Sequence, residues 1–572
     1  MRERTGAFLD RVRIYTLPGH SLHDEPKAIG NVEAHREGGY TFPDQLITLH
    51  AESKVESVVG ARIYQGEIST LDLANRRVWV DWGDDEPNGI PTTILEADGF
   101  FGSGPEKAMA DFAESALAGP SAEGVPPTVV SLLWRKPPVW LEELNASGGF
   151  GSEIGLEAAM RLQPGEVLVV QGPPGTGKSH LGGRIIEALV NRGELVGVTT
   201  QSHAAYQIPI GKAGLPPSMV RIADDGHPAW KKATATKLAG WLDDQTAGVS
   251  GGTKHTFSHP DIANQLDVLI VDEAGQYALA DLIAISRCAK KIILLGDPQQ
   301  LPMVTQAHHP EGPSGLSSIN HWIGDGDIQT VDQRAGVFLE RTYRLHPAIA
   351  DFIGDTFYEG RLQIADPAQE NLGVTLNVGG SSRQVSPLTL IPVDHSDEGS
   401  WSLVEAQAIA RFVFTLVSQG EVVMKSGLRR PFASGAMEPG ADPTTALIPD
   451  ILIVTPYGAQ VERIEFALGQ QADQPAGIDL RPYTRVLTVD KAQGDEAHVA
   501  IYSMVRSAVQ GARHGAEFIL SANRFNVAVS RAEAVAVVVA SPKLLDENPS
   551  GPKHVKALNP FAALMERAEV HE

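Results

Sequence analysis

The stretch that decides the fold is Val167-Leu168-Val169-Val170-Gln171-Gly172-Pro173-Pro174-Gly175-Thr176-Gly177-Lys178-Ser179. Its apolar start predicts a buried strand, and the residues from Ser179 onward predict a helix. Between them lies the pattern G-x-x-x-x-G-K-[ST], which is a phosphate-binding loop when a strand precedes it and a helix follows it. The glycines let successive N–H groups turn toward phosphate oxygens, and the helix N-terminus adds partial positive charge. The chain is therefore predicted to bind a nucleoside triphosphate.

We expect the whole loop to cradle the nucleotide, with Gly172, Pro173, Pro174, Gly175, Thr176, Gly177, Lys178 and Ser179 as binding residues. Lys178 is placed to reach the β- and γ-phosphates, and the hydroxyl of Ser179 is a ligand for Mg²⁺. The alternative is a glycine-rich turn with an unrelated lysine. Such a turn would require neither the strand before it nor the helix after it.

Composition limits the class of protein. A length of 572 residues allows two to four domains, and 42 % apolar with 20 % charged residues is typical of a globular protein in water. No apolar run is long enough to span a bilayer and the start lacks a signal-peptide core, so we expect no membrane contact and a cytoplasmic location. The single cysteine, Cys288, excludes an intramolecular disulfide. A net charge of −23 disfavours general coating by nucleic acid but permits a local basic channel.

Patterns along the chain predict an accessory domain followed by two α/β units. Residues 1–135 form the accessory domain, which is partly β and contains a hairpin over 59–82. Residues 136–335 alternate strands with helical patterns around the phosphate loop, and residues 336–572 repeat that alternation without a loop of their own. A Gly/Pro-rich piece, 426–449, is predicted to be a surface loop or insertion.

Polar residues follow the apolar strands of the first α/β unit. Asp272 and Glu273 come directly after the strand at 266–271, and Gln300 follows the strand at 291–295. Since ligands bind at the carboxyl ends of parallel strands, Asp272 is expected to hold Mg²⁺ and Glu273 to orient and deprotonate the attacking water. The alternative is a pair of solvated carboxylates. An amide at Gln300 is suited to sensing the γ-phosphate, since it both donates and accepts.

Arginines from the second unit are the remaining catalytic candidates. Arg344 lies in Arg341-Thr342-Tyr343-Arg344-Leu345-His346-Pro347, and Arg531 lies in Asn526-Val527-Ala528-Val529-Ser530-Arg531-Ala532. Charge that develops on the γ-phosphate oxygens is stabilised by such residues, with rate gains of ~10³–10⁵. A lone arginine is more often a solvated charge.

Taken together, these stretches resemble the superfamily 1B helicases, in the branch that includes the nonsense-mediated-decay RNA helicase and DNA replication helicase–nucleases. The matching motifs are GPPGTGKS (172–179), VTTQSHAA (198–205), GGT (251–253), VDEAGQ (271–276), GDPQQLP (296–302), TYRLHP (342–347), TPYGAQ (455–460), TVDKAQGDE (488–496) and NRFNVAVSRA (523–532). They cover roughly residues 140–545 in the order of the family. The second half is also similar to the helicase portion of bacterial fusions with a RecB-like nuclease, although residues 1–140 show no nuclease motif.

The resemblance implies two tandem RecA-like domains, α/β in class, with nucleotide between them and a mainly β accessory domain. It implies that Arg344 and Arg531 are arginine fingers and that Tyr343 stacks on adenine. Gln493, Gly494 and Glu496 match positions that link nucleotide state to the bound strand. Thr200, Thr253, Thr455 and Thr488 match positions that contact the nucleic-acid backbone. One departure concerns the adenine-reading glutamine, where the best-placed side chain is Glu153.

The expected activity is ATP- and Mg²⁺-dependent translocation or unwinding, 5′→3′ on a single strand. DNA is favoured over RNA because the similar bacterial proteins are linked to nucleases, and a nuclease or a defence or repair complex is a possible partner. The main alternative is a nucleic-acid-stimulated ATPase that clamps or remodels without unwinding. A P-loop kinase is a second alternative, but it leaves the motifs at 488–532 without a role.

Overall fold

The computed structural model describes residues 28–35, 38–43, 47, 49–51, 53–59, 62–73, 75–83, 87, 89–91, 93–96, 104–117, 125–223, 227–303, 316–324, 328–396, 399–432, 449–470, 478–507, 520–545 and 551–571. The chain divides into two compact units, Met1–Ala110 with Val304–Gly315, and Asp111–Met303 with Leu316–Glu572. Across the described parts, no helix has both the length and the apolar character needed to cross a membrane.

The first unit is built on an antiparallel sheet of seven strands in the order β1-β7-β4-β5-β6-β3-β2. The strands are β1 (Ala28–Gly30), β2 (Glu33–Ala34), β3 (Tyr40–Thr41), β4 (Lys54–Val59), β5 (Arg62–Asp72), β6 (Arg77–Asp81) and β7 (Thr93–Glu96). β5 and β6 pair antiparallel within the stretch expected to form a hairpin, and Asp72 accepts a bond from the N–H of Asn75 in their turn (3.0 Å). The sheet confirms the mainly β character predicted for this region.

The second unit contains a first lobe built on eight parallel strands in the order β11-β10-β12-β9-β13-β14-β8-β15. The strands are β8 (Val167–Gln171), β9 (Leu195–Thr199), β10 (Val220–Ile222), β11 (Lys231–Lys232), β12 (Gly248–Gly252), β13 (Leu266–Val271), β14 (Ala289–Gly296) and β15 (Val337–Phe338). β15 lies beyond the predicted boundary at 335, because a two-residue edge strand has no recognisable sequence pattern. The predicted domain boundaries otherwise stay predictions.

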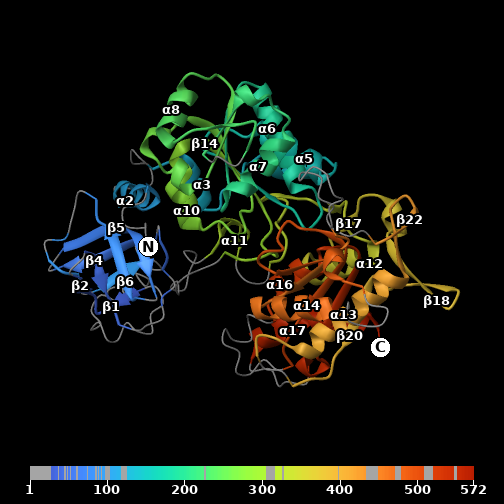
Figure 1. The fold of residues 1–572 in the computed structure, drawn as a ribbon. Helices are drawn as coiled ribbons and strands as arrows, with labels where there is room; N and C mark the ends of the chain where they lie inside the picture. The colour runs from blue at the N-terminus through green and yellow to red at the C-terminus, as the bar shows by residue number, and fades with distance from the viewer. Residues whose placement is uncertain are drawn as a thin grey trace. The chain divides into compact units, whose positions relative to one another are not determined.

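Helices cover the sheet of the first lobe (Figure 1). They are α3 (Pro127–Leu133), α4 (Leu141–Ala146), α5 (Gly151–Arg161), α6 (Lys178–Asn191), α7 (His203–Lys212), α8 (Ala235–Asp243), α9 (Lys254–Phe257), α10 (Leu279–Ile285) and α11 (Ser318–Ile323). Leu168, Ile270 and Ile293 lie in one hydrophobic core with Ile185 and Tyr206 from α6 and α7. The strands read as nearly continuous apolar runs because a parallel sheet is buried on both faces.

A second lobe follows, built on six parallel strands in the order β24-β23-β25-β26-β20-β27. They are β20 (Leu388–Pro392), β23 (Ile451–Thr455), β24 (Thr484–Thr488), β25 (Ala497–Ser503), β26 (Ala532–Ala540) and β27 (Glu569–Val570). Its helices are α12 (Pro347–Phe357), α13 (Leu403–Gln419), α14 (Gly458–Gln470), α16 (Ala522–Val529) and α17 (Pro552–Arg567). Two tandem parallel sheets confirm the predicted α/β class.

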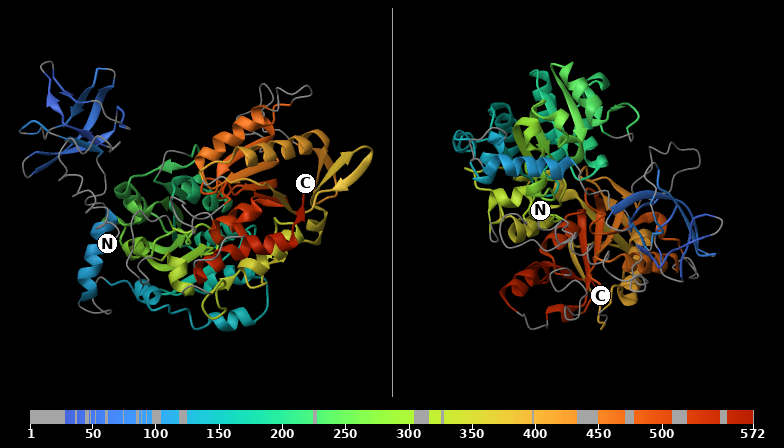
Figure 2. Two further views of the ribbon diagram at one scale, coloured as in Figure 1. Left: turned by 90° about the horizontal axis from the view of Figure 1, so that it is seen from below. Right: turned by 90° about the vertical axis from the view of Figure 1, so that its left-hand side faces the viewer.

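Smaller sheets complete the second lobe. β18 (Gly373–Val378), β19 (Ser381–Gln384), β21 (Gly420–Val423) and β22 (Arg429–Pro431) form an antiparallel sheet, and β16 (Arg341–Thr342) pairs with β17 (Gln363–Ile364). The hairpin of β18 and β19 projects from the lobe, at the right of Figure 1 and of the left panel of Figure 2. Within the stretch 426–449, which is predicted to be a surface loop or insertion, β22 forms by pairing with β21. Residues 433–448 lie outside the described residues.

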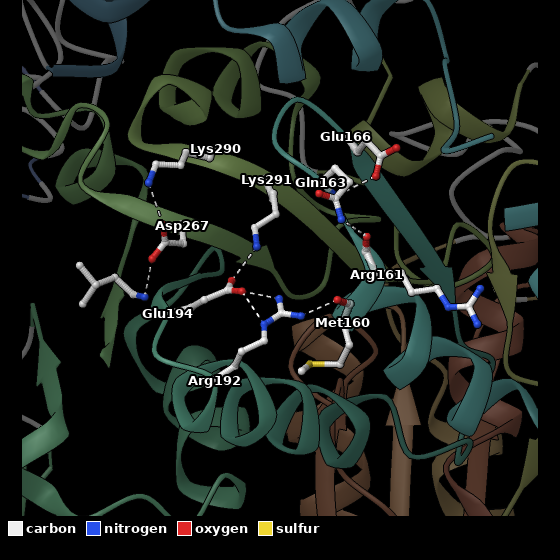
Figure 3. Close-up of polar contacts among 10 residues, drawn as sticks. Met160, Arg161, Gln163, Glu166, Arg192, Glu194, Asp267, Lys290 and Lys291 are labelled. Carbon is white, nitrogen blue, oxygen red and sulfur yellow. Dashed lines mark hydrogen bonds and ion pairs between the residues drawn. The ribbon is translucent and has the colours of Figure 1, made fainter. Parts of the chain in front are cut away.

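A polar network joins the amino-terminal ends of strands in the eight-stranded sheet (Figure 3). Lys291 of β14 is almost fully buried and donates to Glu194 (2.7 Å), which also accepts from Arg192. Burial alone would raise the pKa of the nearby Asp267, but the Leu195 N–H and Lys290 outweigh it, so that pKa lies below its usual range. The network therefore connects the amino-terminal ends of β9, β13 and β14, at the end of the sheet opposite the phosphate loop.

We predict that Glu194→Gln lowers the thermal midpoint of the second unit. The substitution leaves the buried Lys291 ammonium without its charged partner, which costs about 1–3 kcal/mol. Circular dichroism melting of both proteins measures the effect. Glu157→Gln is the matched control, because its ion pair with Arg161 is half exposed on both sides and contributes only about 0–0.5 kcal/mol. Equal midpoints for Glu194→Gln and the control would contradict the prediction.

Candidate active site

The phosphate loop lies between β8 and α6 in the conformation that its glycines permit. Gly175 and Gly177 have φ values of +72° and +81°, in the left-handed region where a side chain is strained. The N–H of Gly172 donates to the carbonyl of Gly296 at the end of β14 (3.0 Å), and the ammonium of Lys178 donates to the carbonyl of Gly172. The loop is thereby anchored to the strand that leads to Gln300.

Residues 342–344 of the next motif pack directly on this loop. The N–H of Tyr343 donates to the carbonyl of Gly175 (2.8 Å). A Cβ built on Gly175 would lie 2.5 Å from Thr342 Oγ1 and 2.6 Å from the Cβ of Arg344, so only glycine fits. The side chain of Tyr343 is 53 % exposed. The fold therefore brings Arg344 to the phosphate loop and leaves Tyr343 accessible to a planar ligand.

The two carboxylates predicted to handle metal and water follow β13. The side chain of Asp272 is buried and accepts from the N–H of Glu273 (3.0 Å), while its own N–H donates to the carbonyl of Thr199 (3.0 Å). Burial, and secondly the charge of Glu273, raise the pKa of Asp272 to about 7, although the Lys178 charge opposes this. Glu273 has a φ of +54°. Such a backbone is uncommon outside glycine and is concentrated at functional sites.

A side chain of the second lobe contacts Glu273. The amide of Gln493 donates to its carboxylate (3.2 Å). Arg344 pairs with Glu496 (2.5 Å) and donates to the carbonyl of Ser530 (3.4 Å). Gly494, which lies in the sequence between Gln493 and Glu496, has a φ of +86°. The structure thus brings together the predicted base, one predicted arginine finger, and the predicted linking residues.

The second predicted finger, Arg531, is buried beside Arg344. Its guanidinium donates to the carbonyls of Val527 and Asp495 (3.0 Å each). Burial, followed by repulsion from Arg344, lowers the pKa of Arg531 to about 9, and the negative charge of Glu273 opposes that shift. Arg344 and Arg531 therefore lie near each other, with the carboxylates of Glu273 and Glu496 close by. This charge pattern is suited to stabilising a polyanion that enters it.

Gln300 is buried and donates its amide to Asp297 (3.0 Å). Asp297 was absent from the sequence prediction, and so was Tyr358, whose hydroxyl donates to the same carboxylate (2.6 Å). Asp297 follows an apolar strand just as Asp272 does, a signal that would have found it. Tyr358 carried no signal, because its role depends on a contact distant in sequence.

The predicted nucleic-acid contacts lie at the carboxyl ends of strands. Thr200 follows β9 and Thr253 follows β12. These two strands pair with each other, and their last residues, Thr199 and Gly252, are register partners. In the second lobe Thr455 and Thr488 are register partners at the ends of β23 and β24. The hydroxyl of Thr200 donates to the Ser202 carbonyl (2.7 Å), and that of Thr455 is buried without a partner among the described residues. Their role in strand binding stays a prediction.

The residues present fit a nucleoside triphosphate with a divalent cation. The glycine-rich cradle and Lys178 match phosphate, and the buried Asp272 gains from a cation beside it. Among the described residues no group of His, Cys, Asp and Glu forms a complete metal cage. Ser179 and Asp272 together with phosphate oxygens suit Mg²⁺, which prefers few protein ligands. Glu153 is exposed on the first turn of α5.

We predict opposite stability effects for two aspartates of this lobe, measured without metal or nucleotide. The raised pKa of Asp272 means that its stabilising contribution is present at low pH and is lost as pH rises toward 7. Asp272→Asn should therefore stabilise the protein at pH 8 by about 2–4 kcal/mol, a gain that shrinks as pH falls toward 4.

Asp267→Asn is the matched control with the opposite sign. The pKa of Asp267 is lowered, so its contribution is present above its unfolded value and is lost on acidification. This variant should lower the thermal midpoint at pH 8. Destabilisation at pH 8 by both substitutions would show that Asp272 is not held in the desolvated setting described above.

Known proteins match this chain over both lobes. A family model described as an AAA domain matches residues 327–543, and another AAA domain model matches residues 157–309. DNA polymerase alpha-associated DNA helicase A of Schizosaccharomyces pombe is 26 % identical over 431 residues, which cover 64 % of this chain and 59 % of that protein.

Two further relatives extend this pattern. The ATP-dependent helicase upf1 of Schizosaccharomyces pombe is 28 % identical over 48 % of this chain and 27 % of its own length. The DNA replication ATP-dependent helicase/nuclease JHS1 of Arabidopsis thaliana is 24 % identical over 67 % of this chain and 28 % of its own length. The chain thus spans less than two thirds of each relative. Its motifs, the two family models and these relatives make the chain similar to the superfamily 1B helicases of the Upf1-like branch.

Proposed function

We propose that this protein is an NTP-dependent translocase or helicase that acts on single-stranded nucleic acid. The observation that carries the proposal is the meeting of the lobes at Glu273. The Gln493 amide of the second lobe donates a hydrogen bond to Glu273. The negative charge of Glu273 also acts on the guanidinium of Arg531, which belongs to the same lobe as Gln493. A site assembled from two lobes reacts to their separation, which is the requirement for a motor.

The chain's own residues account for the chemistry. Glu273 is the base that takes a proton from water, and the Gln493 amide orients its carboxylate. Arg344 and Arg531 stabilise the charge that develops on the γ-phosphate oxygens, and Gln300 orients the water. Bound Mg²⁺ supplies charge neutralisation at the phosphates. Asp272 and Ser179 would hold that cation, and its charge would favour the ionised form of Asp272 over its protonated form.

Strand movement follows from alternating grip. Thr200 and Thr253 line the edge of one sheet, and Thr455 and Thr488 line the edge of the other, so closing the lobes shortens the distance between two backbone contacts. Contacts to the phosphate backbone carry no sequence information, and we expect little sequence preference. The family resemblance supports 5′→3′ movement. It also supports DNA over RNA as the strand, with a nuclease or repair complex as partner.

ATP is the proposed substrate, with relaxed selectivity for the base. A carboxylate at Glu153 accepts from the adenine amino group but, unlike the glutamine that the family resemblance implies there, has no donor for N7. Other nucleoside triphosphates are therefore expected to support part of the activity.

We predict that Glu273→Gln retains nucleotide binding and loses turnover, because the amide no longer accepts the proton from water.

Arg531→Ala should lower kcat by at least ~10²-fold with nucleotide affinity mostly intact. Turnover with single-stranded DNA and fluorescent-nucleotide binding measure both effects. Arg481→Ala is the control, because this exposed arginine pairs only with exposed Asp479 in the described structure.

Because Arg531 is buried, its removal also risks unfolding, so the thermal midpoint of each variant accompanies the kinetics. Arg531→Lys keeps a charge with a smaller change in packing and serves as the second variant. Near-normal turnover in Glu273→Gln would overturn the assignment of the base. A weak effect of both Arg531 substitutions would make that arginine a structural residue.

Strand displacement tests the proposed motor itself. A duplex with a 5′ single-stranded tail should lose its labelled strand in the presence of ATP and Mg²⁺, and a duplex with a 3′ tail should not. Glu273→Gln serves as the inactive control. ATP hydrolysis stimulated by single strands, without strand release from either duplex, would instead favour the clamping or remodelling ATPase.

A further inference from the structure

Helix α16 grips the loop that carries Gln300. Asn523 and Asn526 lie one turn apart on α16, and their side-chain amides bind backbone carbonyls of the first lobe. Asn523 donates to the carbonyls of Pro298 (2.8 Å) and Gln300, and Asn526 donates to the carbonyl of Gln299 (2.9 Å). We call this pair the asparagine clasp. It holds successive carbonyls of one loop from a single helix of the other lobe.

A buried hydrogen-bonded chain lies beneath the clasp. The Asn526 amide also donates to the Tyr358 hydroxyl (2.9 Å), which donates to Asp297 (2.6 Å). The same oxygen of Asp297 accepts from the Gln300 amide (3.0 Å), and its other oxygen accepts from the Gln299 N–H (3.1 Å). Asp297, Tyr358 and Asn526 are each no more than 2 % exposed. Orientation of the Gln300 side chain therefore depends on α16 through Tyr358 and Asp297.

Stability alone does not account for this arrangement. The carbonyl oxygen of Asn526 is buried without a hydrogen-bond partner among the described residues. Unsatisfied buried polar atoms are rare in folded proteins and costly, and an apolar residue would avoid the cost. A carboxylate, a phenol and an amide in one dry contact are better explained by a need for fixed orientation than by packing.

The same helix leads to Arg531. α16 ends at Val529, and the Arg531 guanidinium donates back to the carbonyl of Val527 within it. One helix thus holds the loop of Gln300 through Asn523 and Asn526 and the guanidinium of Arg531 through the carbonyl of Val527. A displacement of α16 moves both groups.

We propose that Asn523, Asn526 and Tyr358 are positioning residues that fasten Gln300 to α16, so that Gln300 and Arg531 reach the reaction centre together. This rests on the function proposed above. Hydrolysis then depends on the second lobe in two ways. That lobe supplies Arg531, and its helix α16 orients the Gln300 amide of the first lobe. A strand that changes the contact between the lobes would alter both at once.

Hydrogen exchange tests the clasp without any ligand or activity. In the nucleotide-free protein, the backbone amides of the non-proline residues within 296–303 should exchange slowly, and at least about tenfold faster in Tyr358→Phe and in Asn523→Ala/Asn526→Ala. Tyr502→Phe is the matched control: Tyr502 is equally buried and packs on Phe525 of α16, but its hydroxyl has no hydrogen-bond partner among the described residues. Unchanged exchange in both variants would overturn the proposal. Should the double variant fail to fold, Tyr358→Phe carries the test.

Kinetics separate positioning from a purely structural role. Tyr358→Phe should lower kcat about tenfold or more and leave the KM for ATP within about twofold. In a Gln300→Ala background the same substitution should have no further effect, because Tyr358 acts through Gln300. Additive effects would overturn the proposal. If the wild type hydrolyses no nucleotide, the proposed function fails, whereas the exchange experiment still tests the clasp.

Discussion

A close contact on which the site depends joins Gly175 to residues 342–344. No side chain fits at position 175, and the Gly175 carbonyl accepts from the N–H of Tyr343. The phosphate loop, which is predicted to bind nucleotide, is therefore also in contact with residues 342–344. Arg344 reaches the loop because the backbone before it is held there. From the second lobe, the Gln493 amide then donates to the Glu273 carboxylate.

The assembled site concentrates like charges at a cost to stability. Asp272 and Glu273 are adjacent carboxylates, and Arg344 and Arg531 are adjacent guanidinium groups, one of each pair being deeply buried. Glu496 and Gln493 offset part of the repulsion by binding Arg344 and Glu273. A cation and a polyphosphate would offset the rest. The site is therefore preorganised for its ligand and strained without it, as is common in enzymes.

The sequence predicted those features that depend on neighbouring residues. The phosphate loop, the strands around it and Asp272–Glu273 each follow from a short pattern, and the fold class follows from their repetition. The Asp297–Tyr358–Asn526 chain depends on three separate stretches, so no local pattern indicates it. β15 and β22 are too short for periodicity to indicate, and burial of Thr455 depends on the helices packed above it. The motif over 523–532 indicates a role for Arg531, but nothing in its pattern indicates that Asn526 contacts Tyr358.

Coupling between the sites works in both directions. If a bound strand favours the lobe arrangement in which α16 holds Gln300, then nucleotide that favours this arrangement must strengthen strand binding by the same factor. Breaking the clasp exposes an amide pair, a phenol and a carboxylate, and each regains hydrogen bonds to water. The net difference between the two arrangements is therefore small compared with the number of bonds exchanged. A small difference lets a modest ligand preference switch the lobes, and a switch that is easily reversed is what a repeating motor requires.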